Sequence, residues 1–253
     1  MRFPGPRDEQ PSTYGTVDSL KVSRNPSGEP EIFCSIQGEG VTSGTPTAFL
    51  RLAVCNLSCT WCDTKYTWDW EHYDRMSEVM EMTIPEVERR VLAFDCPHLV
   101  VTGGEPMLQQ RQLAPLASAL AERGYYCEVE TNGTIAPEPE LADAVAQWNV
   151  SPKTASSSNR AGKREVPAAL EAFSKLGNAY FKFVVVEPSD VDDVRQLVGR
   201  YNLHTDRVIL MPEGTTAGAI QERGRWVAEA SVEHGFRFST RLHISLWGDE
   251  RGR

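Results

Sequence analysis

The sequence lacks any apolar run approaching the roughly 20 residues needed to span a bilayer. Its first fifteen residues, MRFPGPRDEQPSTYG, also lack the apolar stretch of a secretory signal peptide. Basic residues are in deficit, since 26 lysines and arginines stand against 35 aspartates and glutamates, a net charge of -9. No long segment offers the basic footprint that binds phosphate backbones. We therefore expect a cytoplasmic protein that binds neither membrane nor nucleic acid.

Cysteine is scarce, with only 6 in 253 residues, yet three lie in the short segment AVCNLSCTWCD. Cys55, Cys59 and Cys62 form a C-x3-C-x2-C motif that has no fourth thiol nearby. Structural zinc sites are closed by four ligands and ferredoxin-type clusters usually take four cysteines, so three predict a metal centre with one position open for chemistry. In a reducing compartment this spacing favours metal binding over disulfides. The remaining cysteines stand alone and are predicted to be small buried apolar residues: Cys34, Cys96 and Cys127.

The chain divides into an N-terminal arm, residues 1–30, rich in Pro, Gly, Ser and charge, and a single domain over residues 31–253. In the domain, short apolar or β-branched runs alternate with helical periodicity. The predicted strands are EIFCSI, TAFLRLAV, HLVVTG, YYCEVE, WNVS, YFKFVVVE, RVILM and FRFSTRLHI. The predicted helices begin at Thr83, where Glu86 completes a capping box, and cover roughly 107–123, 138–147, 166–176, 189–201 and 216–235. This alternation predicts right-handed βαβ units and a parallel sheet.

Unusual residues recur where the predicted strands end. The cysteine loop follows TAFLRLAV, and four other polar or Gly-rich junctions follow later strands. In parallel α/β barrels, loops at the carboxyl ends of the strands share one face and build the active site. We therefore expect these junctions to converge around one metal centre: residues 102–106 (TGGEP), 130–133 (ETNG), 151–153 (SPK) and 211–214 (MPEG). Residues 65–82 form an acidic, aromatic insertion that we interpret as a lid.

The cysteine motif resembles that of the radical S-adenosylmethionine enzymes, whose C-x3-C-x2-C loop follows the first strand of a partial, open parallel β/α barrel. The resemblance implies a 4Fe-4S cluster on Cys55, Cys59 and Cys62, with the open iron bound by the methionine part of S-adenosylmethionine. It implies that Gly103, Gly104 and Glu105 line the site of the methionine amino group, where glycine carbonyls suit an ammonium. The other implied cofactor contacts are Trp61, Asp63, Ser151, Lys153, Met211, Pro212, Glu213 and Gly214. Asp63 would either touch the cofactor or orient the loop.

A closer resemblance, to the 7-carboxy-7-deazaguanine synthase family, rests on FCSIQGEG, FLRLAVCNLSCTWCDT and VVTGGEP. It implies radical ring contraction of 6-carboxy-5,6,7,8-tetrahydropterin with loss of ammonia. Arg51 would pair with the substrate carboxylate, as an arginine fork does, and the hydroxyl of Thr64 would ligate Mg2+. The other implied pterin contacts are Ile36, Gln37, Gly38, Glu39 and Thr102. The resemblance also implies a flavodoxin- or ferredoxin-like reductant and a homodimer, and it assigns no catalytic acid or base.

Two other functions remain open from the residues alone. A glycyl-radical activase would need an open docking surface, against which Gln37, Glu39 and Arg51 in one site argue. A zinc-binding module would need His72 as the fourth ligand. His243, in the last predicted strand, is a candidate for the substrate pocket, and Trp247 and Gly248 are candidates for closing it.

Overall fold

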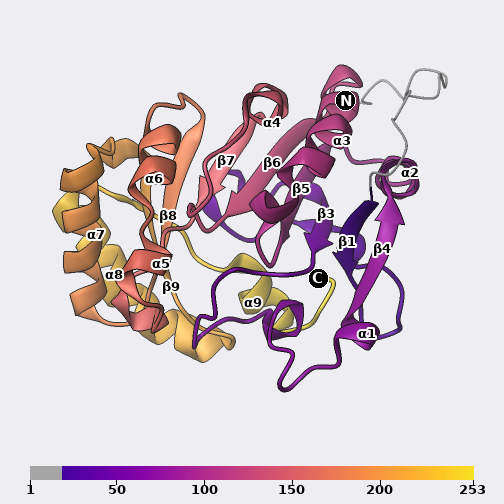
Figure 1. Cartoon of the computed structure of the whole chain (residues 1–253). Coiled ribbons are helices and arrows are strands. Elements are labelled where there is room, and N and C mark those ends of the chain that lie inside the picture. The colour runs from indigo at the N-terminus through magenta and orange to yellow at the C-terminus, as the bar shows by residue number, and fades with distance from the viewer. Residues whose placement is uncertain (1–18) are drawn as a thin grey trace.

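A ten-stranded sheet organises residues 19–253, the part of the chain that the computed structural model describes (Figure 1). Its strands are β1 (Ser19–Ser23), β2 (Ile32–Ile36), β3 (Pro46–Leu52), β4 (Val79–Thr83), β5 (His98–Gly103), β6 (Tyr126–Thr131), β7 (Gln147–Val150), β8 (Ala179–Val185), β9 (Val208–Pro212) and β10 (Arg237–Phe238). They lie in the order β10-β9-β8-β7-β6-β5-β3-β1-β4, and β2 pairs separately with β3.

The central strands β3, β5, β6, β7, β8 and β9 are parallel neighbours, and β10 adds two residues to the outer edge. This confirms the predicted open β/α barrel of about six parallel strands. Register pairs such as Leu50 with Val101 align the carboxyl ends of the strands at one edge of the sheet. The loops that leave this edge therefore lie side by side.

Helices pack around the sheet, most of them on its outer face (Figure 1). They are α1 (Arg75–Glu78), α2 (Ile84–Leu92), α3 (Gln110–Glu122), α4 (Pro139–Ala144), α5 (Ala161–Arg164), α6 (Pro167–Ser174), α7 (Pro188–Tyr201), α8 (Ala217–His234) and α9 (Leu242–Trp247). The predicted capping box of α2 is confirmed, because the Glu86 carboxylate accepts from the Thr83 N–H at 2.9 Å. Among the described residues, no helix is both long and apolar enough to span a membrane.

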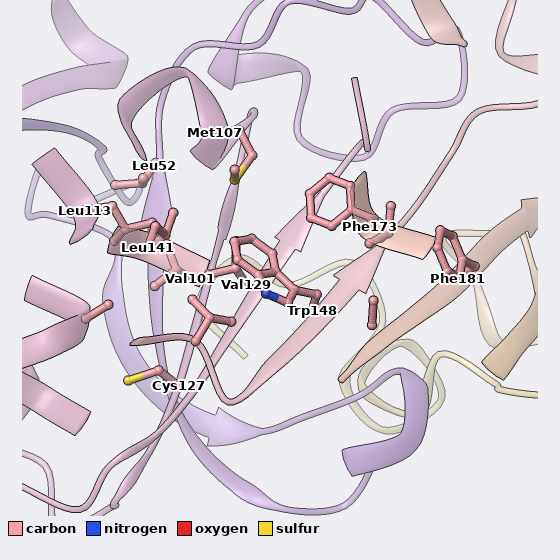
Figure 2. Packing of buried hydrophobic residues seen from close by; sticks show 14 of the residues in the cluster. Leu52, Val101, Met107, Leu113, Cys127, Val129, Leu141, Trp148, Phe173 and Phe181 are labelled. Carbon is pink, nitrogen blue, oxygen red and sulfur yellow. The ribbon is translucent and has the colours of Figure 1, made fainter. Parts of the chain in front are cut away.

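The two faces of the parallel strands differ in polarity, as the alternation of side chains along a strand requires. Val101, Val129 and Trp148 belong to the apolar core beneath the helices, where the Trp148 and Phe173 rings meet edge to face with centroids 5.3 Å apart (Figure 2). On β5 and β6 the residues next to these, Thr102 and Glu130, lie on the opposite face and line a cavity. The period-two pattern thus separates a packed outer face from a polar inner one.

The structure adds to or corrects the predictions for three segments. Residues 19–23 do not belong to an arm but form β1, which pairs antiparallel with both β3 and β4, and residues 1–18 of that predicted arm lie outside the described part. The predicted insertion 65–82 contributes most of β4 to the same edge. FRFSTRLHI contains only the short strand β10, after which α9 begins. A helix of six residues is too short to show a helical period, so its apolar positions resembled those of a strand.

Cys34 was also predicted wrongly. Cys96 and Cys127 are buried as expected, whereas Cys34 is exposed. It lies on β2, which among residues 19–253 pairs only with β3.

Candidate functional site

The five predicted junctions line one cavity at the carboxyl edge of the parallel strands. This confirms their predicted convergence, which follows from the shared direction of strands that are far apart in sequence. The lining residues that represent the junctions are Cys55, Cys59, Cys62, Gly103, Gly104, Thr131, Asn132, Ser151, Lys153, Met211 and Glu213.

Each thiol of the cysteine loop receives one N–H donor. The Leu57 backbone N–H lies 3.5 Å from the sulfur of Cys55, Asn159 Nδ2 lies 3.2 Å from that of Cys59, and Trp68 Nε1 lies 3.3 Å from that of Cys62. N–H donors around thiolate ligands stabilise the negative charge of an iron–sulfur centre. The N–H groups around the three cysteine sulfurs therefore suit an iron–sulfur cluster bound by these cysteines.

Burial raises the pKa of the Cys55 thiol to about 12 and also raises the pKa of Cys59, so a bound cation is needed to hold these groups as thiolates. Within residues 19–253, no three histidine, cysteine or acidic side chains are close enough together to hold a single metal ion. In a cluster each cysteine binds a separate iron, which does not require such closeness. His72, the fourth ligand of the zinc alternative, instead pairs with Asp69 at 2.9 Å and is 73% exposed. The zinc alternative therefore finds no support.

Gly103 and Gly104 bring β5 against the start of the cysteine loop. A β-carbon on Gly103 would lie 2.0 Å from the Leu52 carbonyl, and one on Gly104 would lie 2.1 Å from that of Val54. The Gly104 N–H donates to the Leu52 carbonyl at 2.8 Å. Only glycine fits this close approach, which places the two backbones beside the cysteines.

Glu105 differs from its predicted position. It is fully buried and is not among the residues that line the cavity. Its carboxylate accepts from the N–H groups of Met107 at 3.0 Å and Asn132 at 2.6 Å, and from the Thr131 hydroxyl at 2.7 Å. Burial outweighs these bonds and raises the pKa of Glu105. The side chain fastens the junction after β5 to the junction after β6.

Some of the other predicted cofactor residues line the cavity and others do not. Lys153 Nζ donates to the Ser151 hydroxyl at 2.9 Å and lies 5.4 Å from the centre of the Trp61 ring, and all three residues line the cavity. Met211 and Glu213 line it too, whereas Pro212 and Gly214 do not. The Gly214 carbonyl instead accepts from Arg241 Nη1 at 2.7 Å, so the junction after β9 is tied to the N-terminus of α9.

The predicted pterin contacts also lie on the cavity. Ile36, Gln37, Gly38 and Glu39 enter it from the end of β2 and the loop that follows, Arg51 from β3 and Thr102 from β5. Gln37 Oε1 accepts from the Glu39 N–H at 3.2 Å, which folds the loop back on itself.

A chain of alternating charges crosses the cavity from β6 to the cysteine loop. Lys182 Nζ lies 3.4 Å from Glu130 Oε1 and also donates to Glu39. Arg241 Nε donates to Glu39 Oε1 at 3.0 Å, and Arg241 Nη2 pairs with Asp63. Sequence reasoning placed Glu130 in the site only as part of the junction 130–133, and it missed Lys182 and Arg241. A lone lysine within the apolar run YFKFVVVE was the available signal for Lys182.

These pairs fix the ionisation of the polar face. Burial alone would raise the pKa of Glu39, but Lys182 and Arg241 outweigh it and hold the pKa far below its usual range. Burial also opposes the charge on Asp63, and Arg241 reverses that effect and lowers its pKa. His243 lines the cavity from α9, not from a strand as predicted, and burial lowers its pKa, which leaves the imidazole neutral near pH 7. The site thus presents carboxylates and cations in matched pairs.

Asp63 lines the cavity and its carboxylate is bonded to Arg241, a contact that is compatible with the predicted role of orienting the cysteine loop. Thr64 lines the cavity with its hydroxyl 3.6 Å from the sulfur of Cys62. It precedes a short 3-10 turn (Lys65–Thr67) without making a side-chain capping bond, so its oxygen stays available to a ligand. Of the closing candidates, Gly248 lines the cavity, whereas Trp247 is not among its lining residues.

The radical SAM superfamily matches residues 51–198 of the chain. A protein named 7-carboxy-7-deazaguanine synthase from Pyrobaculum aerophilum is 41% identical over 225 residues, which span 88% of this chain and 96% of that relative. The synthase of the same name from Halobacterium salinarum is 35% identical over 265 residues, which span 96% of each. Among solved structures, QueE from Escherichia coli has a TM-score of 0.68 at 25% identity and covers 89% of this chain and 95% of its own.

Proposed function

The chain belongs to the radical SAM superfamily and, within it, to the 7-carboxy-7-deazaguanine synthases, and we propose that it converts 6-carboxy-5,6,7,8-tetrahydropterin to 7-carboxy-7-deazaguanine with loss of ammonia. The observation that carries this function is the meeting, in one cavity, of a three-cysteine loop with an arginine and paired carboxylates. That arrangement suits a small polar substrate held beside a metal centre.

Cys55, Cys59 and Cys62 would hold the 4Fe-4S cluster, and the Gly103–Gly104 backbone with Ser151 and Lys153 would hold S-adenosylmethionine. When bound, the reduced cluster and S-adenosylmethionine together supply the one-electron chemistry that removes a hydrogen atom from the substrate. The protein contributes positioning and the exclusion of water. The N–H donors to the three sulfurs fix the cysteine loop, and the buried Glu105 holds the neighbouring junction in place.

The polar face would orient the pterin. Lys182 pairs with both Glu39 and Glu130, and both carboxylates can accept hydrogen bonds from the N–H edge of the ring. Thr102 donates to Glu130 Oε2 at 2.8 Å and fixes its rotamer. Arg51, at the rim of the same face, would form a bidentate pair with the substrate carboxylate.

We further propose that Thr64 supplies one ligand to a Mg2+ ion completed by substrate oxygens and water, since Mg2+ prefers hard oxygen ligands and few from the protein. A flavodoxin- or ferredoxin-like protein would be the electron donor, and the enzyme would work as a cytoplasmic homodimer. The resemblance of the sequence to the synthase family supports these additions.

Anaerobic incubation with the carboxylated tetrahydropterin, S-adenosylmethionine and a chemical reductant tests the function. Mass spectrometry should detect 7-carboxy-7-deazaguanine with the wild type and with Cys34→Ala, but not with Cys59→Ala, which should also have lost its iron. The absence of this product from an iron-replete wild type would reject the function. Full iron content and activity in Cys59→Ala would reject the cluster assignment.

A further inference from the structure

Glu31 is a buried carboxylate outside the set of residues that line the cavity. It directly precedes β2 and is 1% exposed, with its side chain fully covered. A charge removed from water must be compensated by partners that donate to it. The role of Glu31 can therefore be inferred from the side chains that donate hydrogen bonds to its carboxylate.

Three side chains donate to Glu31. Arg51 Nε lies 2.8 Å and the Tyr66 hydroxyl 3.0 Å from Oε1, and Arg251 Nη2 lies 3.3 Å from Oε2. The Arg51 backbone N–H also donates to the Glu31 carbonyl at 3.1 Å. Arg51 is thus held to one residue through its backbone and its side chain.

The bond through Nε leaves the two terminal nitrogens of Arg51 for another ligand. Neither of them forms a hydrogen bond with any residue between 19 and 253, and the side chain is 18% exposed where it lines the cavity. An arginine fork held at Nε can present its remaining N–H donors to a carboxylate with little loss of rotamer freedom.

The other partners of Glu31 are themselves fixed. The Arg251 guanidinium stacks on the Tyr66 ring, with its carbon 3.4 Å from the ring centre, and pairs with Glu78 at 3.2 Å. Arg251 lies near the end of the chain, and Glu78 ends α1, so distant segments converge on this carboxylate. A flexible partner could not hold Arg51 in one direction, whereas this packed group can.

We infer that Glu31 is a positioning residue that aims Arg51 at the carboxylate of the substrate, with Tyr66 and Arg251 holding Glu31 in turn. The inference rests on the proposed function, in which the substrate is a carboxylated pterin. Glu31 is not among the residues that line the cavity, so we expect its effect to be confined to the recognition of the carboxylate by Arg51.

Glu31→Gln tests this role, because the amide keeps the shape but loses the charge and one acceptor oxygen. We expect the KM for the carboxylated tetrahydropterin to rise at least about tenfold, since Arg51 loses a hydrogen bond between two charged groups that fixes its direction. Turnover at saturation should change little. Affinity for a tetrahydropterin without the carboxylate, measured by anaerobic titration, should be the same in variant and wild type. Glu29→Gln is the matched control, since Glu29 is 64% exposed and pairs at the surface with Arg90.

An unchanged preference for the carboxylated pterin in Glu31→Gln would overturn the inference. Equal loss of affinity for both pterins would also overturn it, by showing a purely structural role. If Glu31→Gln does not fold, Tyr66→Phe should raise the same KM by a smaller factor and leave the unsubstituted pterin unaffected. A wild type that binds neither pterin would instead reject the proposed function.

Discussion

Gly38 lies directly against the imidazole of His243. A β-carbon placed on Gly38 would come within 2.0 Å of His243 Nδ1, and the Leu242 N–H donates to the Gly38 carbonyl at 2.8 Å. Because Gly38, the second residue of the segment QGEG, has no side chain, α9 can approach the loop after β2 closely. Both Gly38 and His243 line the cavity, so this contact shapes the proposed pterin site.

Gly38→Ala should displace His243 and the start of α9. Overpacking of this kind costs about 1–3 kcal/mol, and we expect pterin affinity to fall by about tenfold while iron content stays normal. Anaerobic titration with the carboxylated pterin measures the effect. Gly199→Ala, at a helical position with no atom within 4 Å of the added carbon, is the control. Equal affinities in the two variants would contradict the proposed contact.

Lys182→Met should destabilise the protein strongly, because it leaves Glu39 and Glu130 without their shared cation in a site where Lys182 is 4% exposed. Removing one partner of a buried ion pair typically costs about 3–5 kcal/mol. Anaerobic thermal unfolding of the iron-loaded proteins should show a clear fall in melting temperature. Lys163→Met, at an exposed position of α5, should melt close to the wild type. Similar melting temperatures of both variants would show that Lys182 is not needed to stabilise the carboxylates of Glu39 and Glu130.

Trp68→Phe should make the cluster harder to reduce. The indole N–H lies 3.3 Å from the sulfur of Cys62, and hydrogen bonds to cluster sulfurs favour the more negative, reduced state. A redox titration followed by electron paramagnetic resonance should place the midpoint potential of the variant below that of the wild type. Trp70→Phe changes a nearby indole that packs on Arg75, and it should leave the potential unaltered. Identical potentials in all three proteins would count against this hydrogen bond.

Thr64→Val keeps the shape of the side chain and removes its oxygen. We expect a normal cluster, loss of stimulation by Mg2+, and loss of most turnover, because a lone hydroxyl is a metal ligand only together with substrate oxygens. In the wild type, Mg2+ and the pterin should each tighten the binding of the other. Product formation is measured across a Mg2+ titration in both proteins. Normal turnover that still responds to Mg2+ would place the metal away from Thr64.

The sequence predicted the parallel barrel and the meeting of its junctions because both depend on local pattern. The period of a strand or a helix can be recognised within a short stretch of sequence. The carboxyl ends of parallel strands lie at the same edge of the sheet. Cys55, Gly104 and Ser151 could therefore be assigned to one site, although nearly a hundred residues separate the first from the last.

Contacts between distant segments could not be predicted in this way. Lys182 meets Glu39 across 143 positions, and Arg241 meets Asp63 across 178. The partner of each residue cannot be known until the register of β8 and the course of α9 are known. β1 was missed for the same reason, since its strand character depends on pairing with β4, about sixty residues later in the chain.

We propose that the enzyme contracts a pterin ring in this cavity and uses S-adenosylmethionine as a catalytic cofactor that is regenerated in each turnover. The most direct measurement is an anaerobic reaction with excess carboxylated tetrahydropterin, a chemical reductant and S-adenosylmethionine held below the amount of substrate. Mass spectrometry then counts 7-carboxy-7-deazaguanine formed for each S-adenosylmethionine supplied. We predict more than one product molecule for each cofactor molecule. Formation of no deazaguanine, or a yield that never exceeds the cofactor supplied, would contradict the account.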